Sequence, residues 1–508
     1  MSERAVIVGV GQARRRPGVD FPDQDWRPVE AVDLVADCLR SAASDAGDES
    51  LLQDADAIGW IPAISWRYDD PPARLAQALG RGPIATGWAT PSGGDSGVQI
   101  LNDAANRIAT GSAKIVLLGG CEVLYSRRRA RKQGIDLEEH WTPGGSEFRL
   151  DQDSARFATA LEIRHGVDRP IAAYPLLENA LRASSGRNPD EHLRYLAALY
   201  ARFSEVAEDN PVSWFPDARS EADLARVDAR NRWVGFPYPK NMNAIMEVDQ
   251  GAGAIVMAES EADRRGIPQS KRVTFLGGAR SVDAWSVSLR PDLTTSPAYA
   301  AATREAQQHA GIETADIDLF DLYSCFPSAV QLAMKALGIE ADDPRGFTQT
   351  GGLAHHGGPG NAYSMHAVCN TVNALRQGRG KLGWVSGLGM TATKHAVCAL
   401  STDRERIAAC DGRATQVDLD PALREGPELV DAPNGDARIE SYTVLYDREN
   451  LPKRSIFLLQ LADGRRSMAN GSHDSDEVRR LTESEGVGLT GQVTAGNDGE
   501  PNLFQLNA

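Results

Sequence analysis

The sequence lacks the features of a membrane protein, of a disulfide-rich scaffold and of a nucleic-acid binder. No apolar run approaches the ~18–20 residues of a membrane-spanning helix, and the chain passes from Met1 into a strand-like segment without the pattern of a signal peptide. The six cysteines are scattered and form no CxxC pair, so we expect neither a disulfide framework nor a zinc site. The net charge of −16 repels phosphate backbones. These absences predict a cytoplasmic protein with no membrane or nucleic-acid partner and no bound metal.

The 508 residues exceed the ~100–200 typical of one domain, and their apolar pattern favours an α/β fold. Residues 5–10, 56–64 and 114–120 form short apolar runs typical of strands. Residues 29–46 and 96–110 have the apolar spacing of helices. Strands that alternate with helices in this way are typical of buried sheets covered by helices.

An internal repeat is the most informative pattern. Residues 106–114 (NRIATGSAK) precede IVLLGG, and residues 373–381 (NALRQGRGK) precede LGWVSG. The Asn, the Gly, the Lys and the Gly that closes the strand recur at one offset, which indicates two copies of one helix–strand unit. The alternative is a chance match between two generic units of this kind.

The remaining segments predict an insertion and a separate β domain. Residues 122–240, rich in Arg, Asp, Trp and Pro, interrupt the α/β rhythm and contain helical patches at 176–184 and 190–207. Insertions at the carboxyl ends of strands commonly build binding sites. Residues 403–435 are polar and linker-like, and residues 436–508 hold β-rich runs and one helix-like piece at 475–484. This last part predicts a small β domain of the barrel or OB type.

Five segments, in order, carry a resemblance to a known family: SGVQILNDAANRIATGSAKIVLLGGCE (96–122), EVDQGAGAIVMAES (247–260), SPAYAAATREAQQHAGIETADIDLFDLYSCF (296–326), GGLAHHGGPG (351–360) and VSGLGMT (385–391). Together they resemble the thiolase superfamily, over residues 5 to about 402. The trailing β domain makes the chain similar to the type 1 thiolase-like proteins, with the sterol-carrier-type thiolases as wider relatives.

The resemblance implies a thiolase fold. Two repeated βαβαβαββ halves, residues 1–270 and 271–402, would stack in α-β-α-β-α layers. The insertion would form a helical loop domain, and an OB-like β domain would follow the linker. Thiolases commonly dimerise through the sheet of their first half, so a homodimer is possible, with a monomer as the alternative.

The polar groups of a thiolase are missing at the matching positions. A thiolase needs a thiolate at a helix N-terminus, donors for the thioester oxyanion and a base for an α-proton. The resemblance places the nucleophilic Cys on Gly94, the His of the GHP loop on Gly358, the second Cys on Val385 and the group that holds the oxyanion water on Tyr323. We therefore expect no ordinary cysteine-dependent thiolase.

Neighbouring side chains could replace the lost groups. Ser92 and Asp95 flank Gly94, as a displaced nucleophile or, in the alternative, as helix N-caps. His355 and His356 precede Gly358, and one of them could act as a base, unless they are loop histidines that face solvent or a carbonyl. Ser386, beside Val385, is placed in the same pocket. Cys325 could also line the pocket, with a buried, inert thiol as the alternative.

Tyr323 suggests a different reaction. Some thiolase-fold relatives without the Cys cleave a carbon–carbon bond by retro-aldol chemistry, with tyrosines as acid/base groups and a small OB-type partner protein. Tyr323 matches their frame, although their second tyrosine would fall on Gly358, and Tyr363 is out of register. The alternative is that Tyr323 fills the pocket and its hydroxyl binds a carbonyl.

The basic run Arg127, Arg128 and Arg129 follows the GGCE turn in an otherwise acidic chain. It could bind the phosphates of coenzyme A, which would be a substrate or ligand rather than a permanent cofactor; the alternative is a solvated face. Three hypotheses result: an acyl-CoA acyltransferase or lyase of lipid metabolism that works without a cysteine, a non-catalytic acyl-CoA or lipid carrier, and an unrelated nucleotide-dependent oxidoreductase. We discount the third, because GVGQARRRPG lacks the GxGxxG spacing.

Overall fold

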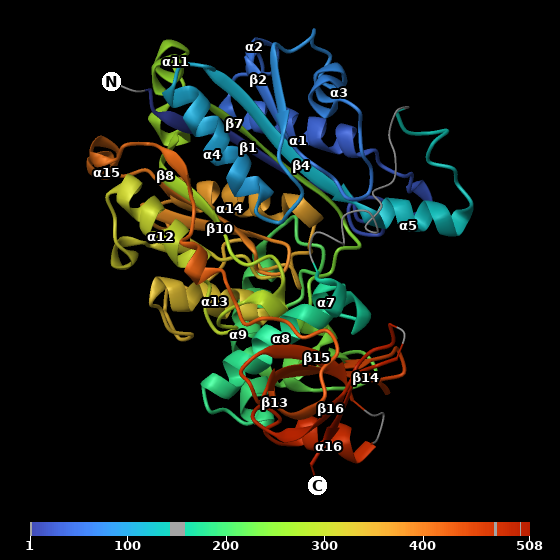
Figure 1. The fold of residues 1–508 in the computed structure, drawn as a ribbon. Helices are drawn as coiled ribbons and strands as arrows, with labels where there is room; N and C mark the ends of the chain where they lie inside the picture. The colour runs from blue at the N-terminus through green and yellow to red at the C-terminus, as the bar shows by residue number, and fades with distance from the viewer. Residues whose placement is uncertain (1–2, 143–157, 472–474, 498, 508) are drawn as a thin grey trace.

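The computed structural model describes residues 3–142, 158–471, 475–497 and 499–507, so part of the predicted insertion lies outside the described residues. The first half alternates strands and helices as predicted (Figure 1). Its elements are β1 (Ala5–Arg14), α1 (Ala31–Ala46), α2 (Leu51–Asp54), β2 (Ala57–Ile61), α3 (Pro71–Ala78), β3 (Thr86–Ala89), α4 (Ser96–Ala109), β4 (Ile115–Val123) and, after the insertion, β7 (Asp249–Ala258).

The second half follows through α11 (Glu259–Arg264). Its elements are β8 (Val273–Val282), α12 (Pro297–Ala310), β9 (Leu319–Asp321), α13 (Pro327–Leu337), α14 (Tyr363–Arg376), β10 (Leu382–Gly389) and β11 (Lys394–Ser401). The strands of both halves form one sheet in the order β3-β2-β4-β7-β1-β8-β11-β10-β9. The antiparallel pair β1–β8 joins the halves at Val6↔Thr274 and Ile7↔Val273.

The helices make three layers around this twisted sheet. Helices α1 and α3 share an apolar cluster with the outer face of the first half. Helices α4 and α14 contact each other and strands of both halves, so they form the central layer. Helices α12 and α13 cover the second half from outside. Strands β4 and β7 are buried along their whole length, as expected for strands covered on both faces. The α-β-α-β-α arrangement is confirmed.

The repeat corresponds to equivalent elements, α4–β4 and α14–β10. Each helix is followed by a glycine with φ of 73°, Gly111 and Gly378, because a left-handed stop suits glycine. Asp56 and Asp318 each accept the N–H groups of the two residues around the start of the next strand, at 2.7–3.0 Å. One detail differs from the expected βαβαβαββ order, since the described residues between α13 and α14 contain no strand. Phe347 there only accepts one backbone hydrogen bond, from Leu322 at 2.8 Å.

The insertion is mainly helical, as predicted. It contains α5 (Leu124–Gln133), α7 (Ala160–Arg164), α8 (Pro170–Ser184), α9 (Pro189–Asp209), α10 (Glu221–Ala225), β5 (Trp233–Gly235) and β6 (Tyr238–Pro239). The predicted linker is not structureless, because it forms α15 (Arg404–Ala409) and β12 (Ala414–Val417), and β12 pairs in parallel with β8. The domain boundaries given above stay predictions. No helix among the described residues is long and apolar enough to cross a membrane.

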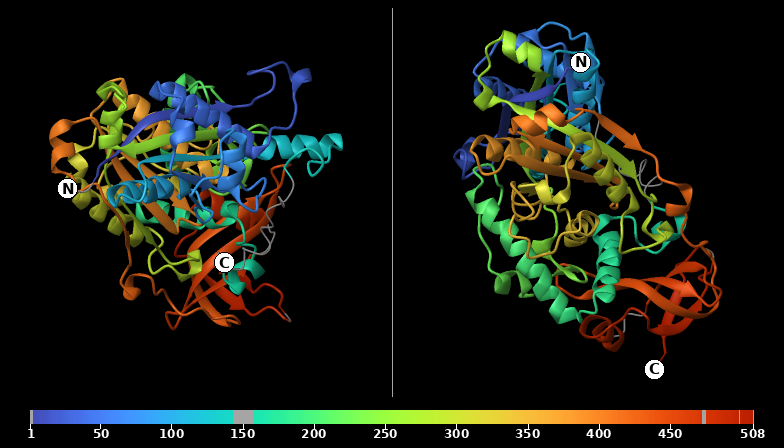
Figure 2. Two further views of the ribbon diagram at one scale, coloured as in Figure 1. Left: turned by 90° about the horizontal axis from the view of Figure 1, so that it is seen from above. Right: turned by 90° about the vertical axis from the view of Figure 1, so that its left-hand side faces the viewer.

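The C-terminal part is a small closed barrel. Its elements are β13 (Gly435–Tyr446), β14 (Pro452–Leu461), β15 (Arg466–Asn470), α16 (Ser475–Glu483), β16 (Thr490–Thr494) and β17 (Leu503–Leu506), in the order β14-β15-β17-β16-β13, with β13 pairing back to β14. The barrel lies at one end of the molecule, beside α8 and α9 and far from α3 (Figures 1 and 2). Buried Arg182 of α8 holds it through an ion pair of 2.7 Å with Glu485.

Candidate active site

Gly94 lies in the turn before α4, and its lack of a side chain leaves space for the Tyr323 hydroxyl. A Cβ added to Gly94 would lie 2.0 Å from the Tyr323 hydroxyl oxygen and 2.5 Å from the Leu388 carbonyl oxygen. Both distances are far below van der Waals contact at ~3.5–4.0 Å. Tyr323 lies just after β9, so this phenol of the second half reaches the start of α4 in the first half. The hydroxyl therefore occupies the space that the resemblance assigns to the side chain of the thiolase nucleophile.

The turn that carries Gly94 is fixed by side chains of the second half. The Lys394 ammonium lies 3.1 Å from the Asp95 carboxylate and donates to the Ser92 carbonyl oxygen at 2.7 Å. Asn361 accepts the Gly93 N–H at 2.8 Å, and the Ser364 hydroxyl donates to the Gly94 carbonyl oxygen at 2.7 Å. These contacts hold the turn around Gly94 in one geometry.

Asp95 differs from the N-cap alternative. It stands at the N-cap position of α4, yet its side chain accepts no capping hydrogen bond. Burial raises the pKa of the Asp95 carboxyl, and the Lys394 ammonium opposes that shift. The side chain therefore binds the facing lysine instead of capping the helix. Ser92 contributes its carbonyl oxygen, as described above, and is half-buried.

Tyr323 is held by a backbone hydrogen bond and a ring contact, and burial keeps its phenol neutral. Its backbone N–H donates to the Ser386 hydroxyl at 3.0 Å. Its ring meets the ring of Tyr363 edge-on, with centroids 5.5 Å apart and planes at 90°. Burial raises the pKa of the Tyr323 phenol well above its usual value, and neighbouring Cys325 and Tyr363 add to the shift. The phenol is therefore protonated at neutral pH and can donate. Comparison of the sequence with the family pattern did not predict this tyrosine pair, because Tyr363 lies out of register and reaches Tyr323 from the start of α14.

His355 and His356 are buried rather than solvent-facing, and only His356 lies beside one of these tyrosines. The His356 ring is 5.9 Å from that of Tyr363 and 4.9 Å from that of His366. The His355 ring instead faces Tyr200, at 6.1 Å. Burial lowers the pKa of His356 well below its usual value and that of His355 to about 3. Both imidazoles are therefore neutral, and the expectation of a loop histidine in water is wrong.

The remaining predicted pocket residues are buried in different ways. Val385 packs in the apolar cluster of the central layer, whereas its neighbour Ser386 binds Tyr323. A Cβ on Gly358 would find the Ile245 carbonyl oxygen at 3.3 Å, a tight but nearly acceptable contact. Burial raises the pKa of all six thiols, to about 12 for Cys325. None of the six, all of which are described, is a thiolate at neutral pH.

The loop after β10 carries backbone strain beside this site. Met390 and Ala392 have φ of 60° and 52°, a left-handed conformation that costs side-chain-bearing residues energy. Buried Tyr174 holds the loop, because its hydroxyl donates to the Met390 carbonyl oxygen at 2.8 Å and accepts the Ala392 N–H at 3.0 Å. Gly94 and Met390 are both only half-buried, so the site reaches the surface where this loop meets the turn before α4.

The predicted coenzyme A arginines lie on α5 and already have partners. Arg129 is 2.8 Å from the Asp23 carboxylate and stacks over Trp26, with its guanidinium 4.6 Å from the ring. Arg128 forms an ion pair with Glu247. Exposed pairs of this kind are worth little energy, so a phosphate could compete with them. The role of Arg127, Arg128 and Arg129 in binding coenzyme A stays a prediction.

Sequence reasoning missed several residues of the site: Lys394, Asn361, Ser364 and Tyr174. The first three pin the turn from the second half, and Tyr174 comes from the insertion. No spacing within the sequence connects them to Gly94, since each contact spans more than two hundred residues. Within the described ranges, no group of three or more His, Cys, Asp or Glu side chains could hold a metal ion.

The repeated halves and the turn before α4 define a protein of the thiolase fold in which the Tyr323 hydroxyl occupies the space beside Gly94. Family models described as "Thiolase C-terminal domain-like" and "Thiolase-like protein type 1 additional C-terminal domain" match residues 279–402 and 414–500. A solved monomeric SCP2-thiolase-like protein type 1 from Mycobacterium smegmatis is 31 % identical, with 99 % of each chain covered and a TM-score of 0.81. This chain belongs to the type 1 SCP2-thiolase-like proteins.

More distant proteins share parts of the chain. The 3-ketoacyl-CoA thiolase of Salmonella paratyphi B is 28 % identical over 335 residues, 62 % of this chain and 72 % of that thiolase. A solved chain named Ltp2-ChsH2(DUF35) aldolase is 18 % identical, with a TM-score of 0.60, and the match covers 79 % of this chain and 99 % of that one. At this identity the second comparison shows a shared fold only.

Proposed function

We propose that this chain binds acyl-CoA thioesters at the Tyr323 site and does not form an acyl-cysteine. The observation that carries the proposal is the Tyr323 hydroxyl, which stands 2.0 Å from where a Cβ on Gly94 would lie. A thioester carbonyl that entered at the start of α4 would meet a neutral phenol donor instead of a thiolate. The 3-ketoacyl-CoA thiolase among the relatives supports the acyl-CoA ligand by its name.

The cysteines support the same conclusion independently. A thiol acts as a nucleophile only as a thiolate, and burial raises the pKa of Cys325, the cysteine next to the tyrosine, to about 12. Fewer than about one thiol in ten thousand would be ionised at neutral pH on that value. Attack by Cys325 on a thioester therefore has no support from its environment.

Calorimetry and mass spectrometry test this proposal together. We expect wild type to bind coenzyme A and acetoacetyl-CoA, to cleave acetoacetyl-CoA no faster than a Cys325→Ala variant, and to show no acyl adduct in the intact mass. An acyl group trapped on any cysteine during turnover would contradict the proposal. Absence of coenzyme A binding in the calorimeter would remove its first half.

A second candidate is retro-aldol cleavage of a β-hydroxyacyl-CoA, favoured by the Tyr323–Tyr363 pair. In this reaction the bond between the α- and β-carbons breaks, and its electrons pass to the thioester enolate. Tyr323, a protonated donor, would stabilise the enolate oxygen and return a proton to the α-carbon. The proton of the β-hydroxyl group would pass, by way of His356 next to Tyr363, to the Tyr323 phenolate, which restores the phenol and leaves an aldehyde or ketone. A solved chain of similar fold is named an aldolase, which agrees with this candidate.

Product analysis separates the second candidate from a simple carrier. A β-hydroxyacyl-CoA incubated with the protein would release an aldehyde or ketone and a shorter acyl-CoA, both measurable by mass spectrometry. Loss of this release in Tyr323→Phe, with coenzyme A binding retained, would support the lyase. If neither thioester is turned over while coenzyme A binds, the chain is an acyl-CoA or lipid carrier.

The oligomeric state and the barrel type belong to the same proposal. The relative from Mycobacterium smegmatis is described as monomeric, so we expect this chain to elute as a monomer with a mass near 54.7 kDa. A dimer in light scattering would contradict this.

The barrel order, with β15 and β17 parallel and β13 closing on β14, matches an OB-type barrel. A role in lipid metabolism remains an expectation that follows from acyl-CoA binding, and a cytoplasmic location remains one that rests on the scattered cysteines.

A further inference from the structure

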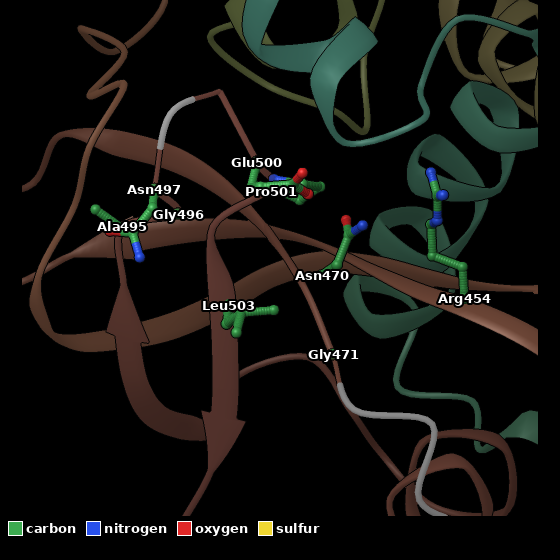
Figure 3. A pocket seen from close by; sticks show the side chains of 9 residues that line it. All are labelled: Arg454, Asn470, Gly471, Ala495, Gly496, Asn497, Glu500, Pro501 and Leu503. Atoms are coloured by element: carbon green, nitrogen blue, oxygen red, sulfur yellow. The ribbon is translucent and has the colours of Figure 1, made fainter.

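The barrel contains a cavity of its own, away from the tyrosine site. It has a volume of about 400 Å³ and is lined by Arg454, Asn470, Gly471, Ala495, Gly496, Asn497, Glu500, Pro501 and Leu503. The lining comes from β14, from the end of β15 and from the segment between β16 and β17 (Figure 3). Cavities of ~300–1,000 Å³ are the usual size for small-molecule sites.

Each end of the cavity carries a charge without an ion-pair partner. The guanidinium of half-buried Arg454 makes no hydrogen bond or ion pair with the described residues. Its guanidinium lies against Gly166, where an added Cβ would stand 2.3 Å from Nη1, so the glycine leaves it room. The exposed Glu500 carboxylate likewise has no ion pair within the described part of the chain.

Between these charges lies an unsatisfied amide. Asn470 is only 8 % exposed, and its Oδ1 accepts no hydrogen bond from the described residues. A buried acceptor without a donor costs free energy of desolvation, so a donor from a ligand would stabilise it. Figure 3 shows the Asn470 amide between Arg454 on one side and the Glu500 and Leu503 side chains on the other. The amide is thus placed to accept a donor from a ligand that also reaches the guanidinium.

The barrel seam explains why this face is open. The parallel pair β15–β17 has a single registered pair, Asn470↔Leu503. Leu503 is 59 % exposed although it belongs to a strand. A large apolar side chain beside an unpaired amide offers an apolar contact to the body of a ligand. The cavity therefore presents a cation, an unsatisfied acceptor, an anion and an apolar surface.

We propose that this cavity binds a small zwitterion, an α-amino acid with an apolar side chain. Its carboxylate pairs with Arg454 in a bidentate contact. Its ammonium group donates to Asn470 Oδ1 and is attracted by Glu500, and its side chain covers Leu503. The nearby Glu500 and the overall negative charge favour a singly charged acid over a phosphate. This site is independent of the function proposed for Tyr323.

Saturation-transfer NMR and calorimetry with the full chain test the site. We use leucine as the probe, with leucinamide, which lacks the acid, and 4-methylpentanoate, which lacks the amine, as matched controls. We expect leucine to bind and each control to bind at least tenfold more weakly. Equal binding of all three, or no binding of leucine at millimolar concentration, would overturn the proposal.

Variants locate the binding on the chain. Arg454→Gln and Asn470→Ala should each weaken leucine binding at least tenfold, whereas Arg438→Gln, an exposed barrel arginine bonded to Gln460, should leave it unchanged. Arg454→Gln should retain coenzyme A binding, which separates failure of this site from failure of the Tyr323 site. Leucine binding that survives both cavity variants would place the ligand elsewhere and refute the assignment. The ligand series on the wild type decides the question even if one variant does not fold.

Discussion

Substitution of Gly94 by alanine tests the geometry on which the proposed function depends. The new Cβ would lie 2.0 Å from the Tyr323 hydroxyl oxygen, 2.4 Å from its Cζ and 2.5 Å from the Leu388 carbonyl oxygen. Each contact is short of van der Waals distance by about 1 Å or more. A backbone carbonyl cannot rotate away, so the buried ring and the end of β10 must both shift. Overpacking of this kind costs about 1–3 kcal/mol.

Differential scanning fluorimetry would measure the effect, with Gly82→Ala as the matched control. An added Cβ on Gly82 meets nothing within 4 Å, so this change should leave the Tm unchanged or raise it slightly. Gly94→Ala should lower the Tm by about 1–3 °C, since a chain of this size has a large entropy of unfolding. The double variant Gly94→Ala, Tyr323→Ala should lose less than the two single variants combined, because removal of the ring relieves two of the three contacts. Equal Tm values for Gly94→Ala and Gly82→Ala would refute the placement of the phenol.

Three further changes probe the same site. Tyr323→Phe should lower any cleavage of a β-hydroxyacyl-CoA by ~10²–10⁴ while the Kd of coenzyme A stays within about twofold; an unchanged cleavage rate would exclude the phenol as the acid. Lys394→Met should destabilise the fold by about 3–5 kcal/mol, since it leaves Asp95 buried without its cation, and Asp95→Asn in the same chain should recover part of the loss, as chemical denaturation would show. His366 has a pKa of about 3 in the folded chain because of burial against ~6.5 when unfolded, so its contribution to stability is complete above pH ~6.5 and is lost as the pH falls towards 3. The free energy of unfolding should therefore fall by about 2 kcal/mol less between pH 7 and pH 5 in His366→Asn than in wild type, and the Tm should fall less as well. An identical pH profile for the two proteins would contradict this.

Much of the fold could be predicted from the sequence because its signals are local. The helix that ends at Gly111 and the helix that ends at Gly378 each carry their own stop signal and the same offset to the next strand. Strands β15 and β17 have only five and four residues and alternate weakly, so the β-rich character of residues 436–508 does not resolve them individually. Strand β12 was missed for another reason: its polar sequence pairs with Gly278–Ser281 of β8, a contact that only the assembled sheet provides.

The candidate site could be predicted only as a set of absences. The sequence placed the lost nucleophile on Gly94, and the structure puts Gly94 at the head of the expected helix. It could not indicate that Tyr323 fills the vacated space, because the two residues are more than two hundred positions apart and meet only through the order of the strands. The neutral state of His355 and His356 was missed as well, since burial, the cause of their low pKa values, is a property of the packed layers.

The departures from the thiolase pattern have different physical causes. Tyr323 and Gly94 depend on each other: with the phenol in place, no side chain fits at residue 94, and with a cysteine at residue 94 the phenol would have to move. Gly358 is independent of this pair, because a Cβ there would approach its nearest atom, the Ile245 carbonyl oxygen, only to 3.3 Å. A histidine at position 358 would therefore be tolerated near the backbone far better than a cysteine at position 94. A cysteine at residue 94 would therefore require exchange of the tyrosine and the glycine together, whereas a histidine at position 358 alone would leave the phenol beside residue 94.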